Sequence, residues 1–293
     1  MTAKGPLDDL RRTDLSTPKL VMADGPASAA TRRTGRWGDL GVRVVSGLVL
    51  AGLGVLSVYE GGAVFLGMTV LIFALMGWEL ASLTDAPAHA ATRIGIAVLA
   101  AFGMAVAQLQ GLGLLGLLLA PAAMALTPRR EKALLAVYTL AMLVAANEFI
   151  ALDRRGAVIV VWLVCIVVAS DVFGYFAGRT FGGPKFWPSI SPKKTWSGTV
   201  AGWFGAAAVG VGFVWWQGGT GWGLVVISPI VAFAGQMGDI VESLIKRRAG
   251  VKDASRLIPG HGGLLDRFDA LIGAILAVRL LALLMPLPLG ITG

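Results

Sequence analysis

Residues 243–269 read SLIKRRAGVKDASRLIPGHGGLLDRFD and interrupt a chain that is otherwise strongly apolar. The segment contains six Lys or Arg residues, three Asp residues and one His, and apolar helical runs lie on both sides of it. Because charges next to lipid are energetically costly, such a cluster indicates a functional site. Carboxylates can hold a hard cation, and basic side chains with glycine amides can hold phosphate.

The composition identifies the protein class. Of the 293 residues, 56% are hydrophobic and only 14% are charged, and the mean hydropathy is +0.76. About a quarter of the residues in a soluble domain are charged, so we predict an all-α polytopic integral membrane protein. The net charge of +8 comes from short loops between apolar runs, as in membrane proteins, and does not indicate nucleic-acid binding. Cys165 lies inside an apolar run and is expected to be a packing residue.

A helix needs about 20 apolar residues to cross the hydrocarbon core of a bilayer. We predict nine such spans, at 40–59, 62–83, 93–109, 111–126, 132–152, 156–177, 198–216, 222–242 and 268–288. The Gly-Leu-Gly at 111–113 separates the third and fourth spans only weakly, which leaves counts of eight or ten open.

Loop charges predict the orientation and the organisation of the chain. Residues 1–36 are polar and basic and are expected to be a disordered cytoplasmic tail. Basic residues then gather in alternate loops, which predicts a cytoplasmic N-terminus, with only Arg154 and Arg155 departing from the rule. Residues 37–155 carry few polar side chains and are expected to be a transmembrane scaffold. Residues 156–293 are expected to be the catalytic half, with cytoplasmic loops at 178–197 and 243–267.

Acidic residues occur at the ends of the last two predicted spans. Asp239 shares a helix face with Glu242, Ser243 and Lys246, and Asp266 and Asp269 lie three residues apart at the start of the next helix. Carboxylates on consecutive helix ends can converge, and such oxygen ligands suit Mg²⁺, with a second cation left open. A simple ion pair between Asp239 and Lys246 is the alternative.

Three further segments carry polar groups suited to phosphate. The glycine-rich turn 259–263 opens onto a helix and contains His261, which can donate to phosphate, accept a proton or simply cap the helix. The segment 189–198 places Lys193 and Lys194 before an apolar helix, beside Trp196, which is also a common interfacial anchor. Asp171 lies within the sixth span and needs a partner, either Arg179 or a polar cavity.

Residues 243–269 resemble the signature of the phosphatidate cytidylyltransferase, or CDP-diacylglycerol synthase, family. The matching residues are Ser243, Lys246-Arg247, Lys252-Asp253, Ser255, Ile258-Pro259, His261-Gly262-Gly263 and Asp266-Arg267-Phe268-Asp269. The runs at 191–198 and 170–178 also resemble family motifs, whereas the first half does so only in hydropathy and length.

The resemblance implies that CTP and phosphatidate react to give CDP-diacylglycerol and pyrophosphate. It implies a Mg²⁺-dependent site with Asp239 and Asp266 as metal ligands. From the loop charges, we expect this site at the cytoplasmic side of the plasma membrane. The predicted catalytic residues are Asp239, Asp266, Lys252 and His261. The predicted substrate-binding residues are Lys193, Lys194, Ser191, Thr195, Asp171, Ser243, Lys246, Arg247, Arg256, Gly262, Gly263, Arg267 and Asp269. The expected partners are the two substrates and membrane lipid, and a homodimer is compatible with the glycine-rich helix faces.

Two other protein classes fit the sequence less well. A CDP-alcohol phosphotransferase carries its aspartates in an Asp-Gly-x-x-Ala-Arg context, which the sequence lacks. A transporter would suit the intramembrane Asp, but the charges gather at one face of the membrane and no inverted repeat is visible.

Overall fold

The computed structural model describes residues 36–84, 90–109 and 112–285, without the side chains of residues 36–40 and 112. The predicted tail 1–36 therefore lies almost entirely outside the described residues. The elements are α1 (Arg36–Glu60), α2 (Gly62–Ser82), α3 (Ala90–Ala107), η2 (Leu112–Leu118), α4 (Leu119–Leu126), α5 (Lys132–Arg155), α6 (Ala157–Thr180), β1 (Lys185–Trp187), β2 (Ser191–Thr195), α7 (Trp196–Trp216), α8 (Gly223–Arg248) and α9 (Leu265–Leu284). Helices dominate these ranges, which confirms the predicted all-α membrane class.

Seven helices in the described part of the chain are long and apolar enough to cross a membrane. They are α1, α2, α3, α5, α6, α7 and α8. Residues 113–126 form a shorter apolar helix, and α9 carries Asp266, Arg267, Asp269 and Arg279 within its 20 residues. The nine-span count and the cytoplasmic N-terminus stay predictions.

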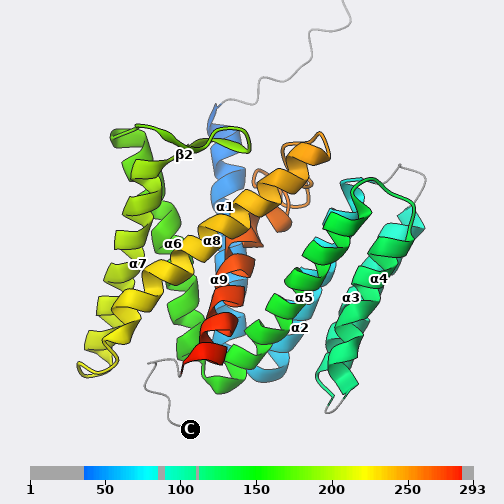
Figure 1. Cartoon of the computed structure of the whole chain (residues 1–293), viewed down its shortest axis with the longest axis horizontal. Coiled ribbons are helices and arrows are strands. Elements are labelled where there is room, and N and C mark those ends of the chain that lie inside the picture. Colours follow the sequence, from blue (N-terminus) through cyan, green and yellow to red (C-terminus); the bar gives the residue numbers. More distant parts are fainter. Residues whose placement is uncertain (1–35, 85–89, 110–111, 286–293) are drawn as a thin grey trace, which may run out of the picture.

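The helices form two groups that meet at α9. Helices α6, α7, α8 and α9 pack closely together, and α8 runs obliquely across this group (Figure 1). Helices α2 to α5 form the second group, in which α2 packs on α3 and α4 packs on α5. Contacts of α9 with α5 and α2 join the groups. The first half of the chain is thus in direct contact with the helix that follows the charged segment.

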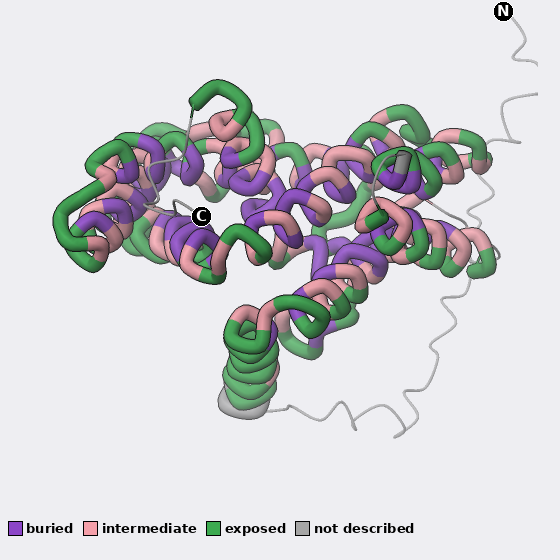
Figure 2. The backbone as a smooth tube through the Cα atoms, turned by 90° about the horizontal axis from the view of Figure 1, so that it is seen from below, coloured by how far each residue is buried: buried purple, intermediate pink, exposed green. Residues whose placement is uncertain are grey.

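Helix α1 stands apart from the rest of the bundle. Figure 2 shows it as a mostly exposed helix, whereas buried residues gather where the other helices meet. Its outward side chains are apolar, for example Leu48 and Val55, which are 68% and 71% exposed. Apolar exposure of this kind suits a helix surrounded by lipid.

Glycines bring the backbones of α8 and α9 into contact. A Cβ atom added to Gly238 would lie 2.4 Å from the carbonyl oxygen of Asp269, and one added to Gly273 would lie 2.3 Å from that of Ala234. Small residues allow such close approach between membrane helices. The crossing sets Asp239, the residue after Gly238, beside the first turns of α9.

A Gly273→Ala substitution is expected to destabilise the protein because its Cβ meets backbone rather than a flexible side chain. Overpacking of this kind costs about 1–3 kcal/mol, measurable as a lower Tm in detergent. Gly67→Ala is the matched control, since a Cβ there meets nothing within 4 Å and alanine favours a helix. Equal Tm values for the two variants would contradict a tight crossing.

The segment between α6 and α7 contains a small antiparallel sheet of β1 and β2, with Lys185 opposite Thr195 and Trp187 opposite Ser191. The sequence predicts only a polar loop here, because strands of three and five residues carry little periodic signal. The Thr195 side chain caps α7 by accepting from the amide of Gly198 at 3.2 Å. The sheet and the end of α8 lie at the same end of the bundle (Figure 1).

Candidate active site

A polar cavity of about 670 Å³ opens between α6, β2, the start of α7, α8 and α9. Nine of the residues predicted for the site line it: Asp171, Lys193, Lys194, Thr195, Asp239, Lys246, Asp266, Arg267 and Asp269. Ser170, which belongs to the motif-like run 170–178 but was not predicted as a site residue, lines it as well, and so do Thr199 and Gln236. Two polar segments far apart in the sequence therefore form one site.

Three carboxylates converge where α8 meets α9, and two of them, Asp239 and Asp269, line this cavity. Oxygen atoms of Asp239, Glu242 and Asp269 all lie within 4.8 Å of one another. Glu242 is fully buried and Asp269 is 8% exposed, so two of the three groups are screened from water. Because hard divalent cations such as Mg²⁺ take oxygen ligands, this donor set fits the metal that the sequence predicted. Helical spacing placed Glu242 on the face of Asp239, but Glu242 was not predicted as a metal ligand or substrate-binding residue.

Asp266 lies in a different network. Its carboxylate accepts from the Lys246 ammonium at 2.6 Å, from the amide of Gly263 at 2.9 Å and from that of Ala254 at 3.0 Å. Lys246 also forms an ion pair with Glu242, so one partly buried lysine links the two acidic groups. The role of Asp266 as a metal ligand stays a prediction.

Lysine and arginine side chains supply positive charge to the same cavity. The Lys194 ammonium lies 2.5 Å from a carboxylate oxygen of Asp239, whose predicted alternative partner was Lys246. Arg267 donates two hydrogen bonds to the carbonyl oxygen of His261, at 3.0 and 2.6 Å. Mixed carboxylate and cationic groups of this kind can bind a metal together with phosphate.

Asp171 lines the cavity at its α6 wall, one of the two environments expected for it. The other candidate partner, Arg179, instead donates to the hydroxyl of Tyr175 at 2.9 Å. Nearby, the Gln236 side chain donates to Ser170 and accepts from the indole of Trp203, both at 3.1 Å. This network fixes the polar side chains where α6, α7 and α8 meet.

Eight predicted residues do not line the cavity: Ser191, Ser243, Arg247, Lys252, Arg256, His261, Gly262 and Gly263. Ser243 nevertheless donates to Asp239 at 3.2 Å, and the Arg247 Nε donates to the carbonyl of Ile190 at 3.5 Å. Lys252 and Arg256 are exposed on the loop. The substrate roles assigned to these residues stay predictions.

His261 and its glycines have partners within the loop and on α1. The Nδ1 atom of His261 lies 2.8 Å from the hydroxyl of Ser46 on α1. Gly262 has a φ of 88°, which favours glycine, and a Cβ there would lie 3.2 Å from Asp266. Gly263 donates its amide to Asp266, so at least one of these glycines orients a carboxylate.

Sequence reasoning missed Glu79, which reaches the charged loop from α2. Its side chain is fully buried and accepts hydrogen bonds from Ser255, Leu264 and Leu265. A single carboxylate near the end of an apolar span was the available signal. The half of the chain predicted as scaffold thus contacts the charged segment 243–269.

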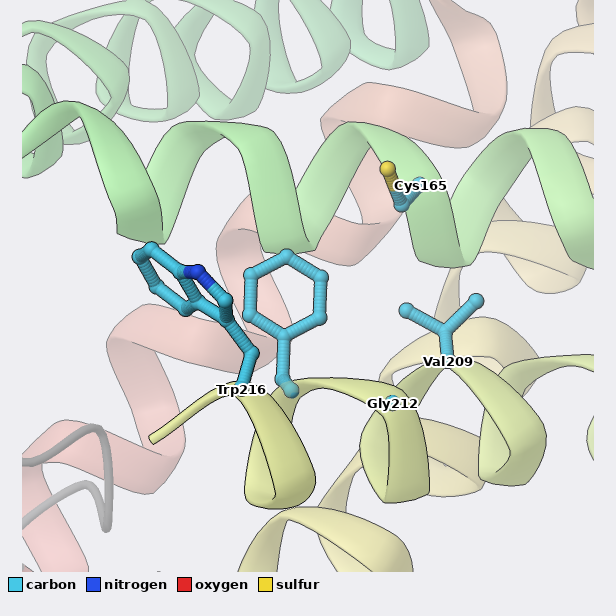
Figure 3. Close-up of a pocket in the computed structure, with 5 residues that line it drawn as sticks. Cys165, Val209, Gly212 and Trp216 are labelled. Carbon is cyan, nitrogen blue, oxygen red and sulfur yellow. The ribbon is translucent and has the colours of Figure 1, made fainter. Parts of the chain in front are cut away.

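A second cavity, of about 250 Å³, lies between α6 and α7 (Figure 3). Its lining is uncharged and comprises Cys165, Val209, Gly212, Phe213 and Trp216. Such a lining offers no group for charge chemistry, so the polar cavity is the candidate active site.

Comparison with known proteins agrees with the family resemblance noted for residues 243–269. Residues 41–285 match the sequence model described as the Cytidylyltransferase family. Proteins named phosphatidate cytidylyltransferase from Brucella abortus, Haemophilus influenzae and Mycobacterium bovis are similar, with 44%, 37% and 38% identity over 122, 127 and 129 residues. These stretches cover 41%, 41% and 43% of the chain and 44%, 44% and 42% of the relatives. The chain therefore aligns with less than half the length of each relative.

Proposed function

From the premise that this chain belongs to the cytidylyltransferase family, we propose that it transfers the cytidylyl group of CTP to phosphatidate. The products are CDP-diacylglycerol and pyrophosphate, as in phospholipid biosynthesis. The observation that carries the proposal is a cavity lined by Asp239, Asp266 and Asp269 together with Lys193, Lys194, Lys246 and Arg267, in a bundle of apolar helices. The names of the similar proteins support the choice of lipid substrate.

The reaction joins two anions, so the site must offset their repulsion. An oxygen of the lipid phosphate forms a bond to the α-phosphorus of CTP, and the bond from that phosphorus to the oxygen bridging it to the β-phosphate breaks. Since the nucleophile is already an anion near neutral pH, positioning and electrostatic stabilisation suffice. We assign Lys193, Lys194 and Arg267 to phosphate binding and to stabilisation of the charge on the departing pyrophosphate.

The carboxylates of Asp239, Glu242 and Asp269 are the residues that would hold Mg²⁺, with Asp266 as the further ligand that the family resemblance implies. When bound, the ion supplies neutralisation of phosphate charge and orientation of the reacting oxygens. Lys194 and Lys246 balance the carboxylates electrostatically and orient them in the cavity.

The proposed site lies at the cytoplasmic interface of the plasma membrane. Basic residues of the loops 178–197 and 243–267 support this orientation through the positive-inside rule. In this arrangement CTP enters from water, while phosphatidate enters laterally from the leaflet.

The proposal is tested with purified protein in detergent, phosphatidate, labelled CTP and Mg²⁺. Transfer of label into the lipid phase, lost with EDTA and restored by added Mg²⁺, is the expected result. Folded protein that gives no labelled lipid would refute the transferase. Uptake of label by vesicles without CTP turnover would point to a transporter instead.

Replacing Lys193 by Ala is expected to raise the KM for CTP, because Lys193 lines the cavity as a cation for phosphate. Loss of one hydrogen bond to a charged group is worth about 1.5–3 kcal/mol, which corresponds to roughly a 10- to 100-fold change. Lys185→Ala is the matched control, since Lys185 is an exposed lysine of the same sheet outside the cavity lining. An unchanged KM for Lys193→Ala would remove Lys193 from the nucleotide site.

A further inference from the structure

Glu79 uses both of its carboxylate oxygens on the charged segment. The Oε1 atom accepts from the Ser255 hydroxyl at 2.5 Å and from the amide of Leu264 at 3.0 Å. The Oε2 atom accepts from the amide of Leu265 at 2.7 Å. An ionisable group buried in an apolar helix is costly, and packing alone would be served by an apolar side chain.

Two of these contacts cap helix α9. The first amides of a helix have no partner within it, and negative charge is favourable at that end. Leu264 precedes α9 and makes no side-chain cap. The carboxylate of Glu79, which belongs to α2, accepts hydrogen bonds from these amides. It thereby supplies the missing acceptor and fixes where α9 begins.

Glu79 and Asp266 hold neighbouring residues of the same loop. Asp266 accepts from the amides of Ala254 and Gly263, while Glu79 accepts from the next residues along, Ser255 and Leu264. Each end of the loop is therefore held by both carboxylates, through Ala254 and Ser255 at one end and through Gly263 and Leu264 at the other.

Gly263 lies between these two acidic groups. A Cβ added there would be 2.8 Å from Glu79 and 3.1 Å from Asp266. The backbone at residue 263 is thus confined on both sides. A displacement of the Glu79 carboxylate would therefore shift this backbone and with it the position of the Asp266 carboxylate.

We propose that Glu79 is a positioning residue, which holds the loop and the start of α9 so that Asp266 faces the cavity. Its consequence for turnover rests on the proposed function. Its structural consequence, an immobilised loop between Ser255 and Leu264, can be measured separately.

The test compares Glu79→Gln with wild type. The glutamine keeps the shape, but its amide nitrogen cannot accept from a backbone amide, so one contact with the start of α9 is lost. Loss of an outer-shell partner costs about 10- to 100-fold in activity, and we expect a kcat decrease of that size with a much smaller change in the KM for CTP. The matched control is Glu148→Gln in α5, a carboxylate that is 5% exposed and pairs with Arg155 and Arg279. It should retain a kcat near that of wild type.

Limited trypsin digestion gives a readout that does not depend on activity. Lys252 and Arg256 are exposed on the loop, whereas Lys185 is exposed in β1. Local loosening should speed cleavage at the two loop sites in Glu79→Gln and leave cleavage after Lys185 unchanged. A general loss of stability would speed cleavage at all three sites and overturn the proposal.

The remaining outcomes are also decisive. A wild-type kcat in Glu79→Gln, with or without faster loop cleavage, would overturn the positioning role. A lower kcat with unchanged cleavage would show that Glu79 does not act on turnover through the loop, and would also overturn the proposal. If Glu79→Gln does not fold, Ser255→Ala removes one contact and should show a weaker form of both effects; wild-type behaviour there would overturn the proposal. Absence of turnover in wild type would refute the proposed function, while the digestion still tests the immobilised loop.

Discussion

An Asp266→Asn variant is expected to lose at least about 100- to 1,000-fold in the rate of cytidylyl transfer, the range for removing one preorganised electrostatic group. The carboxylate accepts from Lys246 and from two backbone amides, of Ala254 and Gly263. Asparagine has one acceptor oxygen, and its NH₂ group would oppose one of these donors. The variant loses the charge next to the proposed metal and disturbs the loop that carries it.

Transfer of label from CTP to lipid measures the effect of Asp266→Asn, with Tm in detergent as the folding check. Asp153→Asn is the control, because Asp153 lies on α5 and its side chain accepts from the amide of Gly62, outside the cavity. Near-normal transfer by a folded Asp266→Asn variant would exclude Asp266 from the reaction.

Replacing Lys246 by Met is expected to have the largest effect on stability. Its ammonium pairs with Glu242 and Asp266, whose side chains are 0% and 8% exposed. Removing one partner of a buried pair leaves an uncompensated charge and costs about 3–5 kcal/mol. Here two carboxylates lose their cation at once, so transfer activity should fall together with the free energy of unfolding.

Reversible unfolding in mixed micelles measures the stability of the Lys246→Met variant. The informative control adds Glu242→Gln, which removes one of the two uncompensated charges. If charge burial is the cause, the double variant should be more stable than Lys246→Met alone, and the non-additivity gives the coupling between the residues. A double variant that is no more stable would contradict this explanation.

Much of the site could be predicted because its residues are concentrated in two short segments. The alternation of apolar runs and basic loops predicted an all-α membrane protein, which the helices confirm, and the pattern of residues 243–269 indicated the family that the match over 41–285 confirms. Helical spacing placed Asp239 and Lys246 on one face, and both line the cavity. These conclusions depend on local sequence, where hydropathy and helical periodicity are reliable guides.

Which charged residues of different helices form ion pairs was decided by the tertiary structure. Sequence spacing did not reveal that Lys194 would pair with Asp239, or that Lys246 would join Glu242 to Asp266. These pairings follow from the backbone contact of α8 and α9 at Gly238 and from the sheet that carries Lys194.

Glu79 shows most clearly the difference between what the local sequence predicts and what the tertiary structure decides. Hydropathy and local motifs were enough to predict the membrane class, the two polar segments and nine of the residues that line the cavity. Only the folded chain brought a carboxylate of α2 to the first amides of α9. Periodicity tells which side of a helix is polar, but the helix that this side meets is decided by packing between segments far apart in the chain.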